Sequence, residues 1–91
     1  MNDRWKLKAK PASMDARFEF TSFETLRTFL DELAEKADSL DHHPNISFAR
    51  THVSVIIYSE DQELNAKDHA LAEAIDECFD HVMNNSEGVL V

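Results

Sequence analysis

Hydrophobic and polar residues alternate strictly near the start of the chain. The segment WKLKAK (residues 5–10) interleaves Trp5, Leu7 and Ala9 with three lysines, and this period of two predicts a half-buried strand. The segment ARFEF (residues 16–20) repeats the pattern with two phenylalanines on one face. The polar stretch from Pro11 to Asp15 predicts the turn between these two strands.

The hydrophobic period changes over residues 21–40. Apolar residues now recur at spacings of three and four, which predicts one face of a helix. These residues are Phe23, Leu26, Leu30, Leu33, Ala37 and Leu40. Thr21 with Glu24 three residues later forms a capping-box pattern, which predicts that the helix starts there. Since His43 precedes a proline, which favours extended geometry, we expect the helix to end before it.

Alternation returns in the segment NISFARTHVSVIIY (residues 45–58). Ile46 and Phe48 alternate with polar neighbours, and three further apolar residues alternate from Val53 to Ile57. Both runs predict strands that form a hairpin with its turn near residues 49–51.

A second helix is predicted after the acidic connection SEDQEL. Asn65 and Asp68 form a pattern typical of a helix N-terminus. Apolar or small residues then follow at helical spacing through Leu71, Ile75 and Val82. From Asn84 onwards the pattern fades, which predicts a tail.

The predicted order is therefore β-β-α-β-β-α, in one domain that spans residues 1–91. Two helices packed on one face of a four-stranded antiparallel sheet satisfy the layering of an α+β domain. A chain of 91 residues buries only about 60–65% of its unfolded surface, so its core is limited. We therefore expect an edge or a face to be buried in an oligomer.

The net charge of −9 argues against broad contact with nucleic acid or with an anionic membrane surface. The cations are unevenly distributed, because Arg4, Lys6, Lys8 and Lys10 supply four of the nine. Lysines on an edge strand discourage aggregation between sheets, and a solvated strand face is one interpretation. A docking surface for an acidic partner is the other.

The single cysteine, Cys78, cannot form an internal disulfide, which is consistent with a reducing compartment. Its position on the apolar side of the second predicted helix indicates a small core residue. No apolar run approaches the roughly 18 residues of a membrane span, and the first ten residues lack the apolar core of a signal peptide. We expect a cytoplasmic protein.

The loop DSLDHHPN (residues 38–45) holds the candidate chemistry. His42 and His43 are adjacent, with acidic residues before them and Pro44 after them. The loop could hold an acid/base pair, half of a metal site or an ordinary polar turn. A zinc site is disfavoured because adjacent histidines on an extended segment point in opposite directions, and Cys78 is distant in sequence.

The chain resembles the pterin-4a-carbinolamine dehydratase family over residues 5–79. The resemblance depends on Trp5, on RFEF entering the first helix, on DSLDHHP, on the strand ending at Tyr58 and on Asp68 opening the last helix. Many members begin with an additional helix, for which this N-terminus has no room. The resemblance implies the fold predicted above without that N-terminal helix.

Carried over position by position, Asp38 matches the acidic residue four before the first histidine, and His42 and His43 match the paired histidines. Pro44 and Asp68 also match, and the resemblance implies that both help to form the substrate pocket. It further implies that a 4a-hydroxytetrahydropterin loses water to give the quinonoid dihydropterin, without a metal or an organic cofactor. His42 and His43 would be the acid/base pair, with Asp38 orienting one of them.

Two positions depart from the family pattern. Arg50 stands where an aromatic residue is usual, and Glu60 or Asp61 stands in place of a third histidine. Glu60 could contact the substrate or take over proton transfer, but its pKa would have to rise well above about 4.3. Such a rise requires burial.

The departures from the family pattern at Arg50 and Glu60 keep a second function open. The chain would then be a binding or assembly protein with the same fold. The family contains dehydratase-like members linked to carboxysomes and proposed as Rubisco assembly factors. The segments RFEFTSFETLRTFLDELAE and ISFARTHVSVII resemble that branch, although it tends to lose the paired histidines. The partner is then Rubisco rather than a pterin, and the protein is associated with carboxysomes. In both interpretations we expect a homodimer formed through a free strand edge, or a tetramer built through helices.

Overall fold

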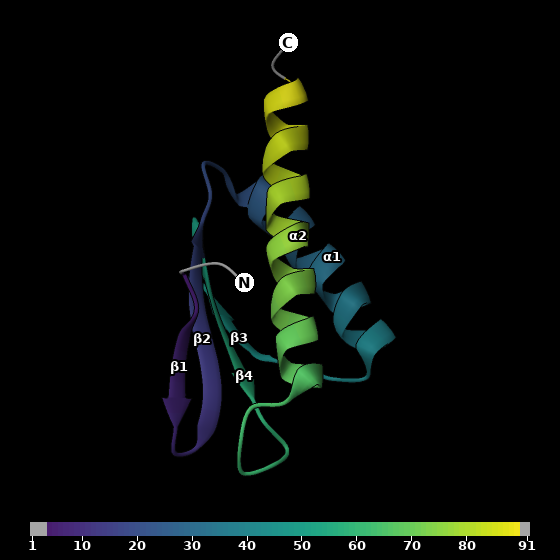
Figure 1. Cartoon of the computed structure of the whole chain (residues 1–91). Coiled ribbons are helices and arrows are strands. Elements are labelled where there is room, and N and C mark those ends of the chain that lie inside the picture. Colours follow the sequence, from purple (N-terminus) through teal and green to yellow (C-terminus); the bar gives the residue numbers. More distant parts are fainter. Residues whose placement is uncertain (1–3, 90–91) are drawn as a thin grey trace.

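The computed structural model describes residues 4–89, and the side chains of residues 4–84. The observed order of elements is the predicted one, and both helices lie on the same side of the sheet (Figure 1). The strands are β1 (Lys6–Ala9), β2 (Ala12–Glu19), β3 (Asn45–Phe48) and β4 (His52–Tyr58), and the helices are α1 (Phe23–Leu40) and α2 (Ala66–Val89).

The sheet has the order β1-β2-β4-β3, with every neighbouring pair antiparallel. The two long strands β2 and β4 are central, and Phe18 lies opposite Val53 in their register. The turn between β1 and β2 is shorter than predicted, because β2 already begins at Ala12. Ala12, Ser13 and Met14 are all buried, so most of the segment predicted as a turn belongs to a strand.

The core lies between the sheet and the two helices. Its centre is a group of phenylalanines from both layers, namely Phe18 and Phe20 of β2, Phe29 of α1 and Phe79 of α2. The ring centroids of Phe18 and Phe29 are 5.0 Å apart, and those of Phe18 and Phe79 are 5.1 Å apart. Tilted contacts at this distance add to the stability gained from apolar burial.

Arg4 and Trp5, directly before β1, are tied to α2. The Arg4 guanidinium lies 2.9 Å from a carboxylate oxygen of Asp76 and stacks over the rings of Phe18 and Phe79. The Trp5 indole nitrogen donates to the same carboxylate at 3.0 Å. Asp76 therefore fixes Arg4 and Trp5 against the second helix.

The two outer strands are more exposed than predicted. Trp5 is buried, but Leu7 and Ala9 are exposed, and so are Ile46 and Phe48 of β3. Leu7 lies opposite the buried Met14, and Phe48 opposite the buried Val53, so both are on the helix side of the sheet. Their exposures of 53% and 56% show that the helices cover the central strands and leave the edges open.

Two helix ends differ from the predictions. The N-cap of α1 is Ser22 rather than Thr21, since the Ser22 hydroxyl accepts a hydrogen bond from the Thr25 backbone N–H at 3.2 Å. Phe23, expected on the apolar face, is exposed in the first turn. The predicted tail from Asn84 is also wrong, because α2 continues to Val89.

The remaining expectations concern Cys78 and membrane insertion. Cys78 is buried in the core as predicted, and this burial raises the pKa of its thiol. None of the helices in the described part of the chain is both long and apolar enough to cross a membrane.

Candidate functional site

The end of α1 determines where the two adjacent histidines point. Asp41 follows the helix with φ 52° and ψ 44°, in the left-handed region. The backbone N–H of His42 donates to the Ala37 carbonyl at 3.1 Å, and that of Asp41 donates to the Asp38 carbonyl at 3.2 Å. This arrangement is a Schellman-type helix end. The chain reverses direction at Asp41, so that His42 enters the protein and His43 follows on the surface.

His42 is buried against the start of α2. Its Nε2 lies 2.6 Å from Oδ1 of Asp68, and the two side chains are only 5% and 1% exposed. The pair joins residues 26 positions apart in the sequence. A short contact between a histidine and a carboxylate fixes the ring orientation and favours a proton on the nitrogen that faces the carboxylate.

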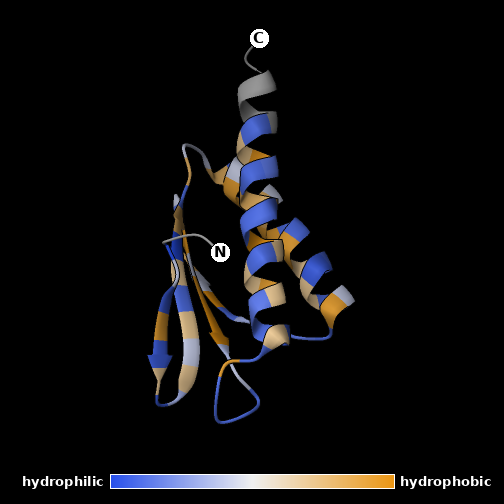
Figure 2. Cartoon of the chain, viewed as in Figure 1, coloured by the Kyte–Doolittle hydropathy of each residue, from blue (hydrophilic) through white to orange (hydrophobic). Residues whose placement is uncertain are grey.

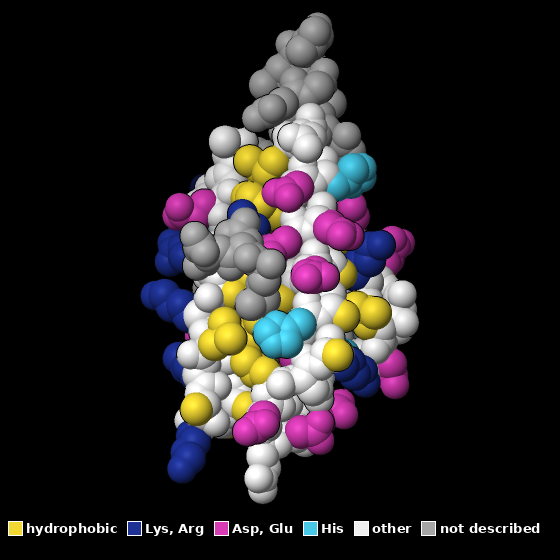
Figure 3. Space-filling model, in the orientation of Figure 1, with side chains coloured by type: hydrophobic (Ala, Val, Ile, Leu, Met, Phe, Trp, Pro, Cys, Tyr) yellow, Lys and Arg dark blue, Asp and Glu magenta, His cyan; other side chains and the backbone are white. Residues whose placement is uncertain are grey.

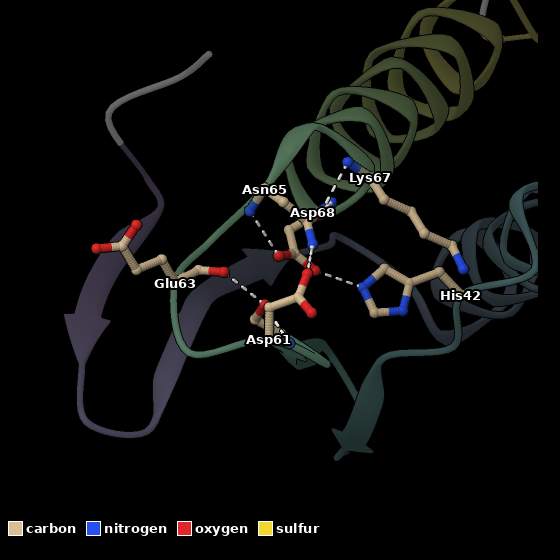
Figure 4. A network of polar contacts seen from close by, with 7 residues as sticks. His42, Asp61, Glu63, Asn65, Lys67 and Asp68 are labelled. Carbon is tan, nitrogen blue, oxygen red and sulfur yellow. Dashed lines mark hydrogen bonds and ion pairs between the residues drawn. The ribbon is translucent and has the colours of Figure 1, made fainter.

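Asp68 is itself held in place from several directions (Figure 4). Its second carboxylate oxygen accepts the backbone N–H of Asn65 at 2.9 Å. The Asn65 side-chain oxygen in turn accepts the backbone N–H groups of Lys67 and Asp68. This reciprocal arrangement is the N-terminal box predicted from the sequence.

The surroundings of Asp68 favour its ionised form. Burial by itself raises the pKa of this carboxyl. Hydrogen bonds from Asn65, His42 and Ser59, together with the charge of His42, outweigh burial and lower the pKa below its ordinary value of 3.8. Asp68 is therefore a carboxylate at neutral pH, and it accepts hydrogen bonds rather than donating them.

His43 makes the second pair, on the surface. Its Nε2 lies 2.8 Å from Oδ1 of Asp38 in the last turn of α1, and the His43 side chain is 61% exposed. The contact places Asp38 beside His43, one of the two histidines that it is expected to orient. The two adjacent histidines therefore contact different carboxylates, one in the interior and one at the surface.

The pairing leaves the same ring atom available on both histidines. In each pair the carboxylate contacts Nε2. When Nε2 carries the proton that it donates, Nδ1 is an acceptor, and in the imidazolium Nδ1 is a donor. The arrangement can thus accept or deliver a proton at Nδ1, in one case from a buried and in the other from an exposed imidazole.

Comparison with known proteins shows the family to which this chain belongs. The family model for pterin 4 alpha carbinolamine dehydratase matches residues 1–78. The chain belongs to this family. A relative from Rhodospirillum rubrum, provisionally named as a pterin-4-alpha-carbinolamine dehydratase, is 33% identical over 73 residues, which cover 79% of this chain and 76% of the relative.

Two solved structures of dehydratase-like proteins have the same fold. One is a transcriptional coactivator/pterin dehydratase from Brucella melitensis, with a TM-score of 0.77, 24% identity and coverage of 85% of this chain and 83% of that one. The other is a pterin dehydratase-like protein identified as a RuBisCO assembly factor in the alpha-carboxysome. It has a TM-score of 0.77, 31% identity and coverage of 85% and 90%. They confirm the predicted sheet of four antiparallel strands with two helices.

The departures from the dehydratase pattern lie in exposed loops. Arg50 is exposed in the turn between β3 and β4, and Glu60 is exposed in the loop between β4 and α2. Figure 2 shows that this second loop is largely hydrophilic. Within this loop, the backbone N–H of Asn65, and not Glu60, donates a hydrogen bond to Asp68. The burial that proton transfer by Glu60 requires is absent.

One further residue of the dehydratase pattern, Pro44, lies close to the histidines in sequence. Pro44 is half-buried directly after His43. Within the described residues, no group of three histidine, cysteine, aspartate or glutamate side chains comes close enough to hold a metal ion.

Ser59 was not recognised from the sequence. Its hydroxyl donates to the Glu63 carbonyl at 2.7 Å and accepts the Asp61 backbone N–H at 3.1 Å, which closes the loop after β4. Asp61 also accepts a hydrogen bond from the Asn65 side chain at 2.6 Å. A serine two residues before another polar residue is the usual signal of such a turn. This local signal does not reveal that the loop is connected to Asp68 through Asn65.

Proposed function

We propose that this chain catalyses the dehydration of a 4a-hydroxytetrahydropterin. The observation that carries the proposal is that adjacent histidines, His42 and His43, are each held through Nε2 by a carboxylate of their own. Membership of the pterin dehydratase family supports it.

The chemistry requires two proton transfers. The hydroxyl on C4a leaves as water if an acid protonates it, and a base removes the proton from N5 to give the quinonoid dihydropterin. Histidine is suited to both steps because its unperturbed pKa of about 6.5 lies near neutral pH. Two imidazoles in different environments can hold different protonation states at the same time.

We assign proton exchange to His43 and His42, each acting at Nδ1. Asp38 positions His43, and the buried Asp68 positions His42. Pro44 and Glu60 are proposed to border the pterin. The reaction needs no metal and no organic cofactor.

A second function is favoured by one comparison. The RuBisCO assembly factor of the alpha-carboxysome shares the fold at 31% identity over 85% of this chain. Arg50 and Glu60, which replace an aromatic residue and a histidine of the dehydratase pattern, are compatible with a scaffold that has lost catalytic power. In this alternative the protein binds Rubisco and is associated with carboxysomes.

We also propose that the protein is a homodimer formed through β3. This strand is an edge of the sheet, and it exposes Ile46 and Phe48 on the helix side. The opposite edge, β1, carries lysines that oppose pairing between sheets. Pairing of two β3 strands across a two-fold axis would cover both apolar side chains.

Stopped-flow dehydration of synthetic 4a-hydroxytetrahydropterin tests the enzymatic proposal. We expect the wild-type protein to exceed the rate in buffer, and a rate equal to that in buffer would reject the activity. Co-expression with Rubisco, followed by a pull-down, tests the alternative. Failure both to bind Rubisco and to improve its assembly would reject it.

A further inference from the structure

The charges of the molecule are divided between its two layers. The segments that form the sheet, residues 4–20 and 45–58, contain six lysines and arginines and two acidic residues. The segments that carry the helices and their connections, residues 21–44 and 59–84, contain three cations and fourteen acids. In Figure 3 dark blue side chains gather along the β1 side, whereas many magenta side chains lie over α2. A chain with a net charge of −9 therefore has one cationic layer.

A groove of about 330 Å³ lies on the side of the sheet that the helices do not cover. Its charged lining comes from Arg4, Lys6, Lys8, Asp15 and Arg17. Lys6 lies opposite Asp15 in the register of β1 and β2, one residue out of phase with the buried Met14. These side chains consequently point away from the core. Ser54 and Ile56 of β4 continue the lining.

The lysines and Arg17 in this groove are available to a ligand. Lys6 forms no ion pair with the residues that the structure describes. Lys8 and Arg17 form long ion pairs of 3.6 Å with Asp15 and Glu19, and exposed pairs of this kind contribute little to stability. Arg4 is different because it is engaged with Asp76 in the core contact described above.

We propose that this groove, lined by Lys6, Lys8 and Arg17, binds an acidic segment of a partner polypeptide. Lys6 and Lys8 are two residues apart on one face of a strand, so their side chains are about 6.4–6.8 Å apart along it. An extended peptide presents alternate side chains at the same spacing. Acidic residues at alternate positions of the partner can therefore meet both lysines, while the half-buried Ile56 offers an apolar contact.

A polypeptide fits this groove better than nucleic acid does. Asp15 lies among the cations, and Glu19 pairs with Arg17. A continuous phosphate backbone would be repelled by these carboxylates and by the fourteen acids of the other layer. A peptide with acidic residues at alternate positions can place the neutral residues between them next to Asp15 and Glu19.

Fluorescence anisotropy tests the proposal. The probe is a labelled synthetic octapeptide that has glutamate at alternate positions and threonine between them. We expect saturable binding at low ionic strength that weakens as salt is added, because the contacts are exposed charges. The same peptide with glutamine in place of glutamate is expected not to bind.

Variants locate the binding site. Lys6→Gln with Lys8→Gln is expected to weaken peptide binding by about tenfold, the effect of losing two rim charges. Lys36→Gln, an exposed lysine of α1, is the matched control and is expected to change nothing. Equal binding by the glutamine peptide, or an equal effect of the Lys36 variant, would overturn the proposal. Tighter binding of a labelled single-stranded DNA 12-mer would overturn the choice of polypeptide.

Self-association is the last outcome to distinguish. If the double lysine variant abolishes association between copies of this chain but leaves peptide binding unchanged, the occupant is a second copy and the proposal is wrong.

The groove is on the face of the sheet opposite the proposed site. Loss of peptide binding in the variants is therefore expected to leave the dehydration rate unchanged.

Discussion

His42 and Asp68 form a buried contact of 2.6 Å that joins the end of α1 to the start of α2. The contact connects two segments that the sheet hairpin of β3 and β4 separates in sequence. It therefore serves both the fold and the proposed site, whereas the His43–Asp38 contact lies at the surface and serves the proposed site alone.

His42→Ala is expected to be strongly destabilising. Removing the imidazole leaves the buried carboxylate of Asp68 without one of its hydrogen-bond partners, and an unsatisfied buried polar group costs about 1–3 kcal/mol, or more when it is charged. His43→Ala removes an exposed partner and is expected to cost less than about 1 kcal/mol. Urea unfolding at neutral pH measures both. Equal losses in the two variants would show that the buried pair is not the stronger one.

The stability of the fold should depend on the ionisation of Asp68. Because the pKa of Asp68 is lowered in the folded state, its contribution is complete above its ordinary value of 3.8. That contribution is lost as the pH falls through the lower folded-state value. Asp68→Asn is therefore expected to be less stable than wild type at pH 7 and to lose less stability on acidification. Parallel pH profiles for the two proteins, measured by urea unfolding between pH 7 and pH 2.5, would contradict this.

Asp41 tests the helix end that directs the two histidines. A β-branched residue in the left-handed region costs about 1–2 kcal/mol, whereas glycine adopts it freely. Asp41→Val is expected to destabilise by that amount, and Asp41→Gly to be neutral or stabilising. Thermal and urea unfolding measure the difference. A destabilised Asp41→Gly variant would show that the aspartate side chain, and not the backbone, sustains the turn.

The exposed side chains of β3 predict the oligomeric state. Phe48→Lys places a charge on the proposed dimer edge and is expected to give a monomer, because an edge lysine opposes strand pairing. Leu7→Lys on β1 is the matched change at the other edge and should leave the dimer intact. Light scattering at micromolar concentration gives the masses. A wild-type monomer, or dissociation by the Leu7 variant alone, contradicts the predicted interface.

Local patterns in the sequence were sufficient for the order of elements and for part of the site. The alternation in β2 and β4, the apolar stripe of α1 and the Asn65–Asp68 box all depend on near neighbours. So does the contact between Asp38 and His43, which are one helical turn and one residue apart. Each of these features involves residues that are close together in the sequence, and the structure confirms the order of elements. The roles of Asp38 and His43 stay predictions.

The rest depends on how the elements pack. Leu7, Ile46 and Phe48 follow a buried-strand pattern but are exposed, because the two helices cover the central strands alone. The burial of His42 and its pairing with Asp68 depend on the left-handed Asp41 and on the position of α2, neither of which a local pattern reveals. The extension of α2 to Val89 also runs beyond the apolar repeat.

Stopped-flow dehydration of 4a-hydroxytetrahydropterin by three proteins tests the central claim most directly. His43→Ala removes an exposed histidine–carboxylate pair of 2.8 Å at the proposed site, and His81→Ala removes a similar pair, with Glu32 at 2.9 Å, elsewhere on the surface. Loss of one acid/base group typically lowers a rate by about 10²–10⁴-fold. We predict that wild type and His81→Ala exceed the rate in buffer equally, and that His43→Ala falls by at least about a hundredfold. Equal rates for the two variants, or a wild-type rate equal to that in buffer, would contradict the account.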